Sequence, residues 1–133
     1  MTFSEQRAAL ATACESVGLT ASGYITDDIQ TPAAIIARAT VDYDVTFGRG
    51  ADSVNWLIRV YVDRADEIAG QDDLDEWVDP ESSSLLKTAI EAASVATAGG
   101  VHYFRLRTAS EVQAVTFGSI TYLFIELTVE AVV

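Results

Sequence analysis

The side chains that could carry out catalysis are few, because His102 is the only histidine and Cys14 the only cysteine. A Ser-His-Asp or Cys-His centre would have to use His102, and no G-x-S-x-G nucleophile motif accompanies it. His102 lies in a predicted strand, which favours a structural or surface histidine. Cys14 lies on the apolar stripe of a predicted helix, as a small core residue does. A zinc site needs more such ligands, so we predict no catalytic residue, no metal site and no cofactor.

The segment Gly48-Arg49-Gly50 has some features of a phosphate-binding loop. A dinucleotide-binding loop needs a third glycine and a helix directly after it. Here Ser53 takes the place of that glycine and a predicted strand follows. We therefore interpret residues 47–50 as a turn.

An acidic cluster is the remaining candidate for a ligand site. It consists of Asp72, Asp73, Asp75, Glu76 and Asp79. Calcium loops alternate their oxygen ligands around a glycine turn, whereas these residues lie on a predicted helix and point in several directions. A solvated helix face explains them best, and a pair of carboxylates doing acid–base work is the alternative.

Charge separates this chain from most nucleic-acid binders. Its 133 residues include twenty acidic and eight basic ones, a formal net charge of −12. A DNA-binding face needs clustered Lys and Arg, so we expect no sequence-specific DNA binding, although net charge also serves solubility alone. We expect neither a signal peptide nor a membrane span. Half of the residues are hydrophobic, which is a hint that copies of the chain associate.

The elements that must position these residues are read from periodicity. We predict a helix over 4–17 ended by Gly18, an extended piece over 22–25, and a hairpin of strands 33–46 and 51–63. An acidic helix over 64–79 follows, and then a helix that Pro80 opens with Asp79 as its N-cap. The rest is three strands, 101–108, 111–117 and 119–132. The order predicts an α+β fold, a mostly antiparallel sheet with helices packed against one face, in a single two-layer domain over 1–133.

Burial should follow the period-two spacing of the two long strands. The residues we expect to be most buried are Trp56, Ile58, Val60, Leu123, Ile125 and Leu127. The last strand is apolar on both faces over Tyr122 to Ile125, so its second face needs a cover. A neighbouring subunit and another layer of the same chain are the two candidates.

A family resemblance covers residues 44–92. Its motifs are the turn Phe47 to Gly50, the strand Trp56 to Arg64, the Q-D-x-L-D helix Gln71 to Asp75, and the helix start Pro80 leading on to Glu91. These resemble the tail terminator proteins of long-tailed (siphovirus-type) bacteriophages, particularly those that infect actinobacteria. Other head–tail connector proteins of the neck, stoppers and adaptors, share this size and build. A small ligand-binding or enzymatic domain is the alternative from another class.

The resemblance implies a structural protein without enzymatic activity. Its copies form a homo-oligomer, usually a hexameric ring, that caps the tube of the major tail protein and joins it to the head–tail connector proteins. DNA passes through the lumen, and the protein belongs to the virion after assembly in the host cytoplasm. We expect subunit or partner contacts at Phe47, Gly48, Arg49 and Gly50, with a plain hairpin turn as the alternative. We expect lumen-facing acids at Asp66, Asp72, Asp73, Asp75 and Glu76.

Overall fold

The computed structural model describes residues 3–22, 32–43, 52–63, 67–82, 85–96, 103–117 and 119–132. Within these residues the chain forms three helices and six strands in the predicted order. They are α1 (Phe3–Ser16), β1 (Thr20–Ser22), β2 (Ala33–Asp42), β3 (Ser53–Asp63), α2 (Glu67–Val78), α3 (Leu86–Ala96), β4 (Tyr103–Ala109), β5 (Gln113–Phe117) and β6 (Ile120–Val132).

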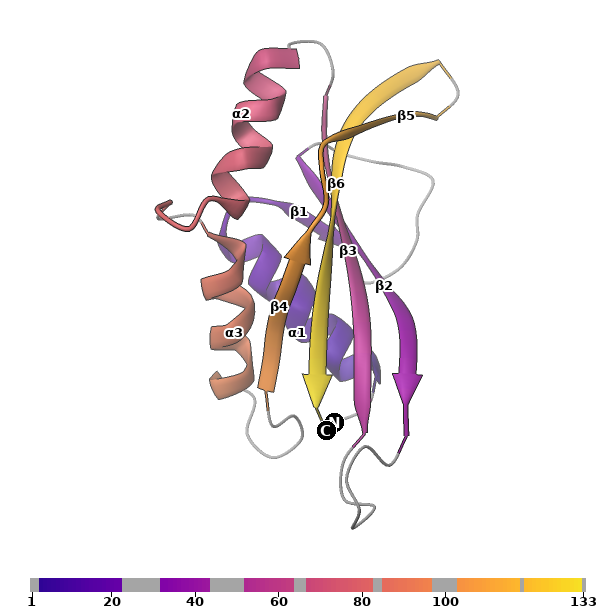
Figure 1. The fold of residues 1–133 in the computed structure, drawn as a ribbon, viewed down its shortest axis with the longest axis vertical. Coiled ribbons are helices and arrows are strands. Elements are labelled where there is room, and N and C mark those ends of the chain that lie inside the picture. The colour runs from indigo at the N-terminus through magenta and orange to yellow at the C-terminus, as the bar shows by residue number, and fades with distance from the viewer. Residues whose placement is uncertain are drawn as a thin grey trace.

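The six strands form one sheet in the order β1-β2-β3-β6-β4, and β5 also pairs with β6, beyond the end of β4. The short β1 runs parallel to β2, and every other pairing is antiparallel. The helices pack against the sheet, with α1 crossing behind it, α3 beside the strand β4, and α2 against β3 and β6 (Figure 1). The predicted α+β class and the mostly antiparallel sheet are confirmed.

The centre of the molecule is the pair β3 and β6, which are joined from Ser53 opposite Val132 to Asp63 opposite Tyr122. Ile58 lies opposite Leu127 and Val60 opposite Ile125. The inward residues of both strands are buried, and the six predicted as most buried are at most 6% exposed. The period-two reading of these strands is therefore confirmed. It works because one face of each strand meets the helices and the other does not.

Helix α1 is fixed to the middle of this sheet through Trp56. The indole Nε1 donates a hydrogen bond to Gln6 Oε1 at 3.1 Å, and both side chains are fully buried. The ring of Phe3 meets the indole edge-on, with centroids 6.3 Å apart. A buried polar group needs a hydrogen-bond partner. This bond therefore fixes where α1 lies along β3, because sliding the helix would leave Gln6 and Trp56 without their partners. Gly18, with φ of 97°, ends the helical segment as predicted.

Helix α2 approaches the sheet at Gly70. A Cβ added at Gly70 would lie 3.1 Å from the carbonyl oxygen of Asp63 and 3.3 Å from side-chain atoms of Val62 and Leu123. A side chain there would press the helix away from β3 and β6. The absence of a side chain at Gly70 thus lets α2 pack closely against the sheet.

The helix predicted to open at Pro80 begins instead at Leu86. Pro80 and Glu81 form a turn, in which the Glu81 N–H donates to Asp79 Oδ1 at 2.9 Å. The prediction that Asp79 is the N-cap of this helix was therefore wrong. Asp79 binds a nearby backbone amide, as expected of a short acidic side chain, but it does so in a turn.

The second face of β6 is closed partly by the chain itself. Tyr61 and Tyr122 point away from the helices, yet they are only 3% and 7% exposed. Tyr61 packs against Tyr122 with ring centroids 6.3 Å apart and against Phe124 at 5.6 Å. Side chains on the same face of the sheet therefore cover part of this apolar stretch, which is neither of the two covers that the sequence suggested.

Candidate functional site

The predicted contact residues lie outside the described part of the chain; they are Phe47, Gly48, Arg49 and Gly50. The predicted lumen-facing Asp66 and the single histidine, His102, lie outside it as well. The strands on either side do show how the chain reverses, because Asp42 lies opposite Ser53 in an antiparallel pair. Tyr43, the residue after β2, is 73% exposed. The hairpin that carries the predicted turn is therefore present.

The acidic residues of α2 lie on its solvent side. Asp72, Asp73, Asp75 and Glu76 are all exposed, whereas Leu74 and Trp77 on the same helix are buried. Among the described residues, no group of three or more His, Cys, Asp or Glu side chains is placed to hold a metal ion. The four carboxylates thus form a solvated face, which we call the acidic face.

The acidic face works against the helix that carries it. Helix α2 has no basic residue in its last turn, and Asp75 and Glu76 lie near that end. The carboxyl end of a helix carries partial negative charge, so each acid there costs about 0.3–1 kcal/mol. Helix stability therefore does not explain this pattern of charges.

Cys14 is buried as predicted, with no exposed surface. Burial, with a smaller effect of the neighbouring Glu15 carboxylate, raises the pKa of the Cys14 thiol from 9.0 to about 12. The thiolate is the reactive form of cysteine. At neutral pH Cys14 is therefore an inert core residue.

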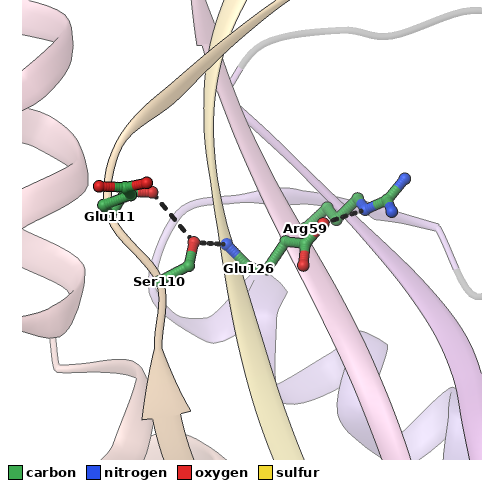
Figure 2. A network of polar contacts seen from close by, with 4 residues as sticks. All are labelled: Arg59, Ser110, Glu111 and Glu126. Atoms are coloured by element: carbon green, nitrogen blue, oxygen red, sulfur yellow. Dashed lines mark hydrogen bonds and ion pairs between the residues drawn. The ribbon is translucent and has the colours of Figure 1, made fainter.

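The outward face of the sheet carries a polar network that the sequence did not reveal (Figure 2). Arg59 Nε donates to Glu126 Oε1 at 3.0 Å. On the other side of β6, the Glu126 N–H donates to Ser110 Oγ and the Ser110 N–H donates to the Glu126 carbonyl, both at 2.8 Å. The Ser110 hydroxyl in turn donates to the carbonyl of Glu111 at 3.0 Å.

This network marks the point where β4 ends and β5 begins. Ser110 lies between the two strands, and its side chain takes over a hydrogen bond that a regular neighbouring strand would accept from β6. The Arg59 and Glu126 side chains in this network are 50% and 32% exposed. The sequence could suggest an Arg–Glu pair, but only the β3–β6 register identifies the partners.

The hairpin of β5 and β6 follows the predicted strands 111–117 and 119–132, but the sequence analysis did not single out its lack of charge. The stretch from Val112 to Ile125 is the longest without a charged residue in the chain. Along β5 the side chains of Gln113, Ala114 and Thr116 are exposed, and Ile120 at the start of β6 is 52% exposed. The hairpin lies at the far end of the sheet from the chain termini (Figure 1). The absence of charge was the available signal.

No protein-family profile matches this chain, and no curated protein is significantly similar to it. No helix in the described part of the chain is long and apolar enough to cross a lipid bilayer.

Proposed function

We propose that this chain is a structural subunit of a bacteriophage virion. In this proposal it is a tail terminator, whose copies form a ring that caps the tail tube and joins it to the head. A stopper or adaptor of the neck is the alternative within the same class. The observation that carries the proposal is the motif series from Phe47 to Glu91, which resembles that of tail terminators. In the structure this series contributes the central strand β3 and the helices α2 and α3.

The acidic face supports the proposal through its charge. A ring through which DNA passes must not bind the phosphates, and carboxylates repel them. Asp72, Asp73, Asp75 and Glu76 are exposed together on one helix without a basic residue among them. In the proposed ring they line the lumen with Asp66. Salt screens exposed charges over a Debye length of about 8–10 Å, so the repulsion acts only near the wall.

Native mass spectrometry over a concentration series, with and without purified tail tubes, tests this function. We expect a closed ring, most simply a hexamer, at high concentration or on tube ends. Rings that bind the head connector but never the tube would indicate a stopper or adaptor. A protein that stays monomeric and associates with neither would contradict the proposal.

The lumen assignment has its own test. The variant Asp72→Asn, Asp73→Asn, Asp75→Asn, Glu76→Gln should still assemble and should retain short duplex DNA more strongly than the unmodified protein. A matched control removes four exposed acids elsewhere, Asp42→Asn, Glu15→Gln, Glu81→Gln and Glu111→Gln, and so changes the net charge equally. Equal DNA retention by both variants would show that only net charge matters and would contradict a lumen-facing helix.

A further inference from the structure

We draw no further inference here: the strongest candidate, the uncharged outer edge of strand β5 in the β5–β6 hairpin, pairs with no strand among the described residues, and nothing in the structure shows what covers it.

Discussion

The strand β6 has two halves with different surroundings. From Leu127 to Val132 it lies between β3 and β4, with Leu127, Val129 and Ala131 buried under the helices and Glu130 on the outward face. From Ile120 to Phe124 it pairs with β5, has no charge, and begins at a half-exposed isoleucine. The first half holds the molecule together. The second also contributes Leu123 to the core, but it leaves Ile120 half-exposed and pairs with β5, whose outer side has no partner among the described strands.

The boundary between the halves is Glu126. Its backbone binds Ser110 in both directions, and its carboxylate binds Arg59 (Figure 2). Ser110 thereby keeps β6 hydrogen-bonded where the neighbouring strand changes from β4 to β5. One long strand can thus serve the core at one end and carry an open edge at the other.

The largest contrast should appear in truncation of one aliphatic side chain in each half. Leu127 is fully buried, so Leu127→Ala should lower the free energy of unfolding by about 2–5 kcal/mol, through lost transfer energy and the cavity left behind. Ile120→Ala removes a side chain that is 52% exposed and should stay within about 0.5 kcal/mol. Urea denaturation measures both. Equal losses would show that the hairpin end belongs to the core after all.

A second test uses the pH dependence of stability, through helix α1, which packs under the half of β6 from Leu127 to Val132. Helix α1 binds there through Gln6 and Trp56, and the pKa of the Cys14 thiol further along it is raised by burial to about 12. Above about pH 9 the unfolded chain releases the thiol proton while the folded chain keeps it. Stability should therefore be full below pH 9 and fall by up to about 1.4 kcal/mol per pH unit towards pH 12.

The matched control is Cys14→Ala, which has no thiol to titrate. It should be less stable at neutral pH but should lack this part of the alkaline slope. Urea denaturation of both proteins between pH 8 and 11 gives the difference. Parallel pH profiles would show that the thiol is not desolvated in the folded state.

The sequence predicted the core better than the surfaces, for a physical reason. Burial on β3 and β6 follows a period of two, which the chain displays directly, so Trp56 and Leu127 could be identified without coordinates. The start of α3 could not, because Pro80 suits both a turn and a first helical turn, and the hydrogen bond between Asp79 and Glu81 decides it. The packing role of Gly70 was not predicted either, because it depends on contact with Asp63 and Leu123 of other elements.

The candidate surfaces show the same division. The exposure of Asp72 and Asp75 follows from helical spacing against the buried Leu74 and Trp77, and was predicted. The free edge of β5 was not, because strand order decides which edges remain unpaired and no local pattern encodes strand order. The network at Ser110 likewise depends on pairing between residues far apart in the sequence.

The junction at Glu126 between the two halves of β6 depends on one side-chain oxygen, Ser110 Oγ. Ser110→Ala removes the acceptor of the partly buried Glu126 N–H, and we expect a loss of about 1 kcal/mol in the free energy of unfolding. Hydrogen exchange of the Glu126 amide should accelerate more than that of Leu127. Ser110→Thr keeps the hydroxyl and is the control. An unchanged exchange rate at Glu126 would mean that Ser110 does not hold the two halves in register.

The smallest effect is expected from the ion pair on the outward face. Arg59 and Glu126 are 50% and 32% exposed, so water and salt screen their attraction, and Arg59→Gln should cost no more than about 0.5 kcal/mol. A double-mutant cycle with Glu126→Gln isolates the pair. The matched control is Arg107→Gln, because Arg107 and Glu130 are 3.9 Å apart on the same face and should couple even less. The Arg59 coupling should shrink further in high salt. A coupling above about 1 kcal/mol that persisted in salt would show that the ion pair at the boundary of the two halves is shielded from water.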